Sequence, residues 1–204
     1  MKSVLQEAER LGGIIGAVSE KLSFDSHYQT ALEIALGASS QHIIVEDEQA
    51  ATRAIEFLKR NRTGRATFLP LTTIKARHLP DHHQGSIEKS TGFLGLASSL
   101  VYYDKSLEHI FQNLLGTTAI FDTVENARAA ARKVRYQVRI VTLDGTELRT
   151  GGSYAGGANR NNNTIFIKPD LDALQKELSE KNVTLAEQER QVEDLHTQLS
   201  QANN

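Results

Sequence analysis

The sequence predicts a mixed α/β domain in two parts, flanked by coiled-coil helices. Between residues 12 and 168, β-rich stretches alternate with amphipathic helical stretches, the pattern of layered α/β domains. The last 36 residues carry a seven-residue apolar repeat and hold eight acids against three bases. Because the 204 residues include no cysteine, the core must form without disulfides or thiolate metal sites. We therefore expect an intracellular protein with three segments, residues 1–11, 12–168 and 169–204.

The first part of the middle segment, residues 12–105, reads as alternating strands and helices. We expect, in order, a β-rich stretch at 14–22, a helix capped by Asp25 and ended by Gly37, a strand at 42–45, a helix at 47–60, and a strand at 66–71. Residues 72–92 are polar, contain Pro80 and Gly85, and show no regular apolar period. They predict an irregular loop or a connection poor in strands.

The second part, residues 106–168, repeats this order on a smaller scale. We expect a helix at 107–115, a strand at 118–121, a helix at 124–134, and strands at 137–142 and 147–149. Asp122 and Glu125 have the spacing of a capping box before the second helix. Asp144-Gly145 predicts the turn between the last two strands.

The C-terminal repeat predicts a coiled coil. Its first seam position holds an aliphatic residue in each of five heptads: Leu171, Leu178, Leu185, Val192 and Leu199. Its second seam position is mixed: Leu174, Lys181, Gln188, Leu195 and Ala202. So narrow an apolar stripe needs a partner helix. Val4, Leu5, Ala8 and Leu11 give a shorter stretch of this kind at the other end. We expect the two helices to pair antiparallel, and the chain to be a piece of a longer protein.

A glycine-rich stretch follows the last expected strand. Gly151, Gly152, Gly156 and Gly157 lie within eight residues, and Asn159, Arg160 and three asparagines come next. A phosphate-binding loop would need a helix, and in the Walker type a Lys-Ser or Lys-Thr pair, after the glycines. The remaining interpretations are a strand edge that another backbone approaches closely and an ordinary flexible hairpin.

Taken together, the ordered motifs resemble the hinge of bacterial structural maintenance of chromosomes (SMC) proteins. The resemblance spans residues 1–204 and is carried by Leu11-Gly12, Gly16-Ala17-Val18, Ala31-Leu32-Glu33, Ala35-Leu36-Gly37, Gly64-Arg65-Ala66-Thr67-Phe68-Leu69-Pro70-Leu71, Gly151-Gly152-Ser153 and Gly156-Gly157. It implies the SMC hinge fold, with subdomain I at about 12–105 and subdomain II at about 106–168.

The resemblance also implies a function that is mechanical. Two copies would form a homodimer through Gly151, Gly152, Gly156 and Gly157, joining two arms of a chromosome condensation and segregation ATPase. ATP and Mg would belong to head domains absent from this chain, and accessory condensin subunits would contact absent regions. We thus expect no catalysis and no cofactor here, and a cytoplasmic, nucleoid-associated location. Apolar runs such as 93–101 are too short for a membrane span.

Basic residues predict weak, sequence-independent binding of DNA. Seven bases against one acid lie between Arg53 and Arg77, including Lys59, Arg60 and Arg62. On the expected helix at 124–134, the spacing of Arg128, Arg132 and Arg135 predicts one stripe. The resemblance adds Arg160 and Lys168, although such hinges often carry a lysine run where Arg160 stands alone. A solvated helix face with scattered ion pairs explains either cluster about equally well.

A second function from another class is a manganese-dependent phosphoesterase with a coiled-coil oligomerisation tail. Asp81-His82-His83 is the one constellation that suggests it. That chemistry also needs aspartates in Asp-x-Asp spacing upstream, and none occurs. We therefore favour a surface loop for Asp81-His82-His83, and a hinge without metal.

Overall fold

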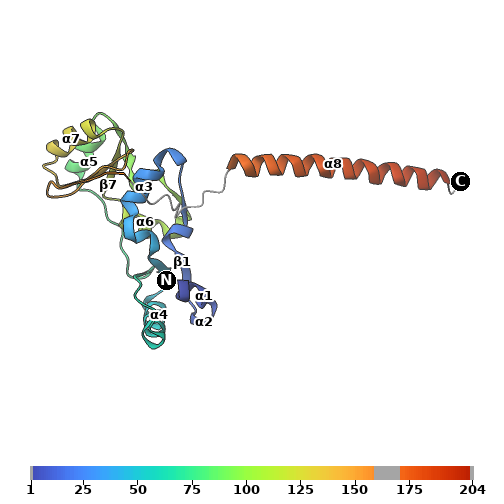
Figure 1. The fold of residues 1–204 in the computed structure, drawn as a ribbon, viewed down its shortest axis with the longest axis horizontal. Coiled ribbons are helices and arrows are strands. Elements are labelled where there is room, and N and C mark those ends of the chain that lie inside the picture. Colours follow the sequence, from blue (N-terminus) through green and yellow to red (C-terminus); the bar gives the residue numbers. More distant parts are fainter. Residues whose placement is uncertain (1, 159–170, 203–204) are drawn as a thin grey trace. The chain divides into compact units, whose positions relative to one another are not determined.

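The computed structural model describes residues 2–158 and 171–202. The chain divides into two units, Met1–Phe166 and Ile167–Asn204, and each is described by itself. Figure 1 shows strands and helices mixed in the first unit and a single long helix, α8 (Leu171–Ala202), in the second. Within the described ranges, no helix is both long and apolar enough to cross a membrane.

A three-stranded sheet forms one part of the first unit. Its spatial order is β1 (Ile14–Ala17), β3 (Ile43–Val45) and β4 (Phe68–Pro70). β1 runs antiparallel to β3 and β4 runs parallel to it, so the chain must cross over between β3 and β4. Helix α4 (Glu48–Asn61) makes that crossover, and Asp47 caps it by accepting a hydrogen bond from the backbone N–H of Ala50 at 2.8 Å. The predictions for 42–45, 47–60 and 66–71 are confirmed within two residues at each end.

The N-terminal stub packs on α4. It forms two short helices, α1 (Lys2–Gln6) and α2 (Ala8–Leu11), which lie beside α4 (Figure 1). Val4 is fully buried in an apolar cluster with side chains of β3 and α4. Burial of Val4 anchors the N-terminal stub to the folded unit. Pairing of this stub with the C-terminal helix stays a prediction.

The chain enters the folded unit through a close approach to α4. Gly12 and Gly13 have φ of +69° and +73°, and a Cβ on Gly13 would lie 2.7 Å from the Cβ of Ala50. Only glycine combines this backbone conformation with that proximity. Arg53 of α4 donates hydrogen bonds to the carbonyl oxygens of Leu11 (2.9 Å) and Gly12 (3.2 Å), which closes the end of α2.

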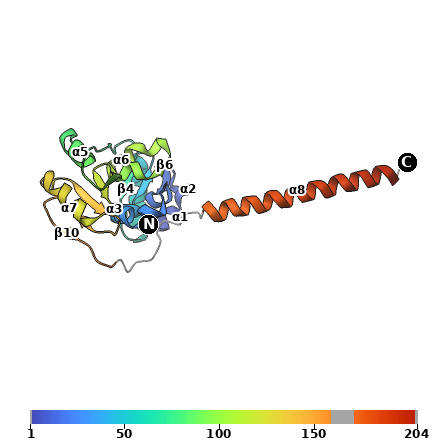
Figure 2. The same ribbon diagram turned by 90° about the horizontal axis from the view of Figure 1, so that it is seen from above.

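A five-stranded sheet forms the other part. Its spatial order is β10 (Tyr154–Ala155), β9 (Glu147–Leu148), β8 (Arg139–Thr142), β7 (Thr118–Phe121) and β5 (Phe93–Leu96). β7 and β8 are parallel and the other pairs are antiparallel. Helices α5 (Asp81–Glu88) and α7 (Val124–Lys133) pack on this sheet, at the end of the unit away from α1 and α2 (Figure 2).

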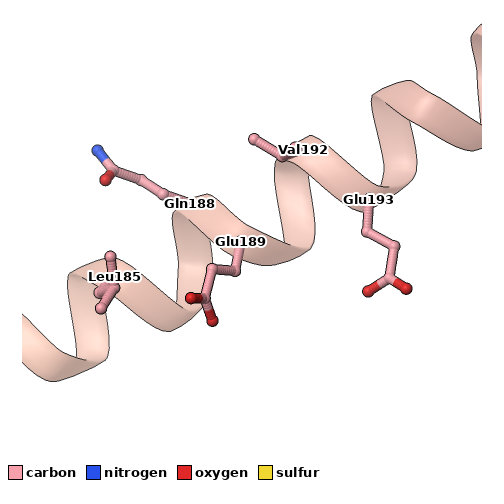
Figure 3. Close-up of a pocket in the computed structure, with 5 residues that line it drawn as sticks. All are labelled: Leu185, Gln188, Glu189, Val192 and Glu193. Carbon is pink, nitrogen blue, oxygen red and sulfur yellow. The ribbon is translucent and has the colours of Figure 1, made fainter.

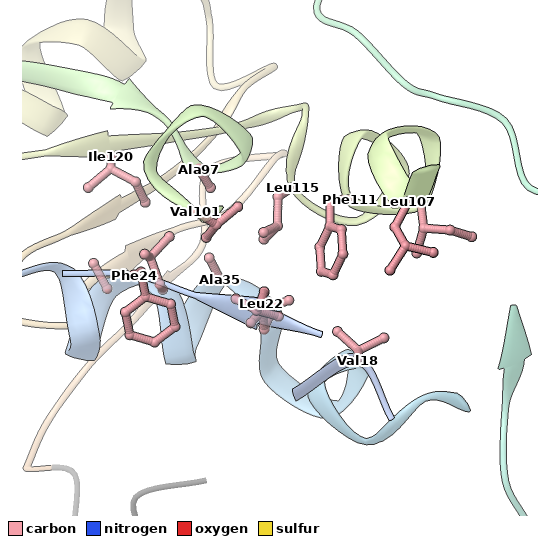
Figure 4. Close-up of a cluster of buried hydrophobic side chains, with 14 of the residues drawn as sticks. Val18, Leu22, Phe24, Ala35, Ala97, Val101, Leu107, Phe111, Leu115 and Ile120 are labelled. Atoms are coloured by element: carbon pink, nitrogen blue, oxygen red, sulfur yellow. The ribbon is translucent and has the colours of Figure 1, made fainter. Parts of the chain in front are cut away.

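A central cluster joins the two sheets. Figure 4 shows side chains of α6 (Glu108–Leu115) facing side chains of α3 (Gln29–Leu36) and of the chain before it. The cluster also includes Ile44 of the first sheet and Ile120 and Val141 of the second. Its buried members are Val18, Leu22, Phe24, Ala31, Leu32, Ala35, Leu36, Ile44, Leu69, Ala97, Val101, Leu107, Ile110, Phe111, Leu115, Ile120 and Val141. The two sheets therefore share one core.

We expect the two subdomains to meet at about residue 105, but each part of the first unit includes chain from both sides of that residue. β5 precedes that residue and pairs with β7, whereas α6 follows it and packs on α3. A two-stranded ribbon, β2 (Leu22–Ser23) with β6 (Tyr102–Tyr103), links the same regions. A single cut at residue 105 does not separate the sheets.

The loop predicted at residues 72–92 is wrong in part, because α5 forms within it. Pro80 precedes the first turn, and its carbonyl oxygen accepts a hydrogen bond from the N–H of Gln84 at 2.9 Å. Ile87 is the one buried residue of this helix, so the segment shows no apolar period. A polar helix with one anchoring residue resembles a loop in sequence.

Two predicted helix caps are also wrong. Before α7 the cap is Thr123, whose Oγ1 accepts from the N–H of Asn126 at 3.3 Å. Asp122 instead accepts from the N–H of Thr123 and the side-chain amide of Asn126, so it supports the turn one residue earlier. Asp25 makes no side-chain cap bond, because a 3-10 turn stands between it and α3.

Arg139 of β8 connects α3 to the five-stranded sheet. Its guanidinium donates to the carbonyl oxygens of Ala35 (2.8 Å) and Ile34 (3.1 Å) near the end of α3, and to Glu147 Oε1 (2.8 Å). Glu147 is 8% exposed and also accepts from the more exposed Arg149. One side chain therefore satisfies two helix-end carbonyls and a buried carboxylate.

We predict that Arg139→Met lowers the free energy of unfolding by about 1–3 kcal/mol, because it leaves these buried acceptors without their donor. Arg149→Met is the matched control, since it removes the exposed partner of the same carboxylate and should cost less than about 1 kcal/mol. Urea denaturation of both variants measures the difference. Equal losses would contradict the assignment of the bridge to Arg139.

Candidate functional site

The glycine-rich stretch lies at an edge of the five-stranded sheet. β10 pairs with β9 through Tyr154 opposite Leu148 and Ala155 opposite Glu147. Among the described residues, no strand pairs with the other side of β10. The N–H and C=O groups of an open strand edge can pair with another chain.

Three of the four glycines are required by their own backbone conformation. Gly151, Gly152 and Gly157 have φ of +87°, +95° and +130°, which side chains with a Cβ rarely adopt. A Cβ on Gly151 or Gly157 would meet nothing within 4 Å, and one on Gly152 would make an ordinary 3.9 Å contact with Tyr136. Strain, rather than crowding, excludes other residues at these positions within one copy.

Gly156 differs from the other three. Its φ lies outside the positive range, and a Cβ there would lie 3.5 Å from Thr146 Oγ1, an ordinary contact. Among the described residues of its own copy, nothing therefore requires glycine at residue 156. A close approach by a second chain would supply the missing reason.

Two tyrosines, one within the glycine-rich stretch and one from the turn after α7, pair beside the glycines, and no sequence pattern indicated them. The hydroxyl oxygens of Tyr136 and Tyr154 lie 3.3 Å apart, and their rings meet edge to face at 6.4 Å between centroids. The hydrogen bond from Tyr154, and then Arg132 and Arg128, lower the pKa of Tyr136 from its ordinary value. The same hydrogen bond raises the pKa of Tyr154. Because 18 residues separate the two, no spacing in the sequence could pair them.

The predicted arginine stripe is shorter in the structure. Arg128 and Arg132 are exposed on α7, one turn apart, and lie near the tyrosine pair. Arg135 lies beyond the end of α7 with φ of +51°, so the helical spacing does not extend to it. The stripe therefore has two arginines rather than three.

The other basic cluster lies at the end of α4. Lys59, Arg60 and Arg62 are exposed, and Arg60 forms an ion pair with Glu56 at 3.4 Å. Arg62 ends the helix in the left-handed conformation. Figure 1 shows α4 and α7 at opposite ends of the first unit, so the structure does not bring the two clusters together. Arg160 and Lys168 lie outside the described residues.

Asp81, His82 and His83 form the first turn of α5 rather than a surface loop. Asp81 and His82 are exposed, and the two histidine rings lie 4.0 Å apart. Within the ranges that the structure describes, no group of three histidine, aspartate or glutamate residues could hold a metal ion. The constellation that suggested a phosphoesterase is an exposed helix start.

The C-terminal helix α8 spans 32 residues, which confirms the predicted helix over this segment. Its apolar seam is open where side chains are described: Leu178, Leu185 and Val192 are 62%, 54% and 66% exposed. Figure 3 shows Gln188 and Val192 projecting from one side of the helix, and Glu189 and Glu193 from the other. An exposed stripe of this kind is typical of a coiled-coil helix shown without its partner.

Comparisons with known proteins agree with this architecture. The model of the "SMC proteins Flexible Hinge Domain" family matches residues 11–131, which include Asp81, His82 and His83. The chain is 43% identical over 197 residues to the chromosome partition protein Smc of Bacillus subtilis, covering 96% of this chain and 17% of that protein. This chain thus spans about a sixth of the relative's length.

Two solved hinge structures are similar to the model. The asymmetric dimer of the Geobacillus stearothermophilus SMC hinge domain matches with a TM-score of 0.83 and 40% identity, covering 93% of this chain and 76% of that one. The Pyrococcus furiosus SMC hinge domain matches with a TM-score of 0.64 and 32% identity, covering 79% and 80%. This similarity confirms the predicted mixed α/β hinge fold. The chain belongs to the family of SMC flexible hinge domains.

Proposed function

We propose that this chain is the homodimerisation hinge of a chromosome condensation and segregation ATPase. The observation that carries the proposal is Gly156, which directly follows the open-edge strand β10 and which no described residue of its own copy requires to be glycine. The solved relative named as a dimer supports pairing of two copies, and the relatives named chromosome partition proteins support the cellular role. Binding through the same edge on both copies, or through an edge of each sheet, would give a closed twofold assembly.

In this proposal the hinge does no chemistry of its own. Its work is to hold two arms together while ATP, with Mg, is hydrolysed in head domains outside this chain. Accessory subunits would bind those outer regions, and the protein would act in the cytoplasm on the nucleoid. In the expected antiparallel pairing, α1 and α2, anchored on α4, and α8 would belong to one arm, and the second copy would supply the other arm.

DNA binding is the second part of the proposal. Arg128 and Arg132 on α7, and Lys59, Arg60 and Arg62 at the end of α4, are exposed and would meet phosphates without reading bases. Arg135, Arg160 and Lys168 stay candidates for the same contacts. Each cluster holds few charges, so we expect micromolar or weaker affinity that is driven by counterion release.

We predict that Gly156→Val weakens the dimer at least tenfold and leaves a folded monomer, because a Cβ there makes only ordinary contacts in its own copy while the added side chain would obstruct a second copy. A tenfold change corresponds to about 1.4 kcal/mol. Gly85→Val is the matched control: Gly85 also lacks a positive φ and has nothing within 4 Å, but it lies on α5. Sedimentation equilibrium measures both constants. If the Gly156 variant dimerises like the control, the edge is not the contact.

A second matched pair separates contact from backbone strain. Gly157 and Gly64 both have positive φ and nothing within 4 Å of a built Cβ, so alanine should strain both positions alike. We predict that Gly157→Ala weakens the dimer and Gly64→Ala does not, although both lose similar thermal stability. If the Gly157→Ala and Gly64→Ala variants have equal dimer dissociation constants, backbone strain alone accounts for glycine at residue 157.

For DNA, we predict that the logarithm of the affinity falls linearly with the logarithm of the salt concentration. Changing Arg128 and Arg132 together to glutamine should reduce that slope by up to about 1.8, near 0.9 for each lost phosphate contact. Lys105→Gln, which removes an exposed base outside both clusters, should leave the slope unchanged. Fluorescence anisotropy with labelled DNA at several salt concentrations measures the slope for each variant. An unaltered slope in the double variant would remove α7 from the DNA contact.

A further inference from the structure

β10 is too short to hold its own position. It consists of two residues and makes two residue pairs with β9, and glycines with positive φ precede and follow it. Such a segment loses much conformational entropy when it becomes ordered. Ordering β10 would therefore reduce the free energy gained when a partner chain pairs with it, unless another group already orders the strand.

The backbone of Tyr136 is one such group. Its carbonyl oxygen accepts a hydrogen bond from the N–H of Gly151 at 2.9 Å, which ties the start of the glycine segment to the end of α7. Arg135 and Tyr136 reach this position through two successive left-handed residues, with φ of +51° and +56°. Two consecutive non-glycine residues in that region are uncommon and carry a cost in free energy. The N–H of Tyr136 donates to the carbonyl oxygen of Ala131 at 2.8 Å, which fixes the turn to the helix.

The side chain of Tyr136 supports the same segment. It is half-buried against the apolar cluster under α7, whose members include Ala127, Val134 and Ile140. Its ring would lie 3.9 Å from a Cβ on Gly152, and its hydroxyl lies 3.3 Å from that of Tyr154 in β10. The ring therefore rests on the core and meets the ring of Tyr154 in β10 edge to face, with 6.4 Å between the ring centroids.

We infer that Tyr136 is a positioning residue for dimerisation, which orders β10 before a second copy pairs with it. The inference rests on the proposed function, since it concerns the same edge. It goes further in assigning the order of that edge to a residue in the turn between α7 and β8, 15 positions before Gly151. Tyr136 acts through β10 and needs no contact with the partner.

The test compares three variants of the full chain by sedimentation equilibrium. Tyr136→Asn removes the ring but tolerates the left-handed conformation, and we expect its dimer dissociation constant to rise at least tenfold. Tyr136→Phe keeps the ring and loses only an exposed hydroxyl contact, and its constant should stay within about threefold of the original. Tyr102→Asn removes an exposed tyrosine from the β2–β6 ribbon and should change nothing.

Hydrogen exchange provides a readout that general destabilisation would not reproduce. At concentrations where each protein is monomeric, the amides of residues 151–155 should exchange faster in Tyr136→Asn, while those of α5 and α7 keep their original rates. If Tyr136→Asn melts more than about 5 °C lower, Tyr136→Gly replaces it, since glycine also removes the ring and adopts a positive φ without strain.

Each outcome decides one proposal. A dimer of unchanged affinity in Tyr136→Asn would overturn the positioning role, and so would a tenfold weakening in Tyr136→Phe, because the ring would then not be the supporting group. If the unaltered chain is itself monomeric, the proposed dimer fails first. A dimeric parent with an unaffected asparagine variant leaves the dimer in place and removes Tyr136 from it.

Discussion

An open strand edge is the constraint on which this account depends. The free N–H and C=O groups of β10 can pair with water, with another chain, or with an aggregating neighbour. Most proteins cover or shorten such an edge. Here the edge is short and is bordered by glycines, one of which, Gly156, is required by no contact or φ among the described residues. A second copy pairing at this edge would explain that glycine.

The shared core makes that edge useful for a mechanical function. Because one apolar cluster includes residues of both sheets, and Arg139 ties α3 to β8, the sheets are held as one folded unit. The N-terminal helices are anchored to the same unit by Val4 and by the Arg53 hydrogen bonds. In the proposed function, a force on α1 and α2 would therefore reach the core directly instead of being absorbed at a loose junction.

Much of this fold could be predicted from the sequence, because its longer elements have strong periods. Apolar patterns in the sequence predict the buried strands β3, β7 and β8 and the helices α4, α6, α7 and α8. Gly37 and Gly116 mark the ends of α3 and α6. The failures share a physical cause. α5 buries one residue, and β2, β6 and β10 have two residues each, so none has a period to detect. The cap at Thr123 lay one residue from the predicted Asp122, since both side chains accept hydrogen bonds from the same turn.

The candidate site was predictable in its composition and not in its surroundings. The four glycines stand out in the sequence, but only coordinates distinguish Gly156 from three glycines that their own φ requires, or place Tyr136 beside Tyr154. The most direct test of the central claim is the solution mass of the unaltered chain, measured by sedimentation equilibrium over a range of concentrations. The account predicts the mass of two 22.5 kDa chains, falling to that of one on dilution. The mass of a single chain at every concentration would contradict it.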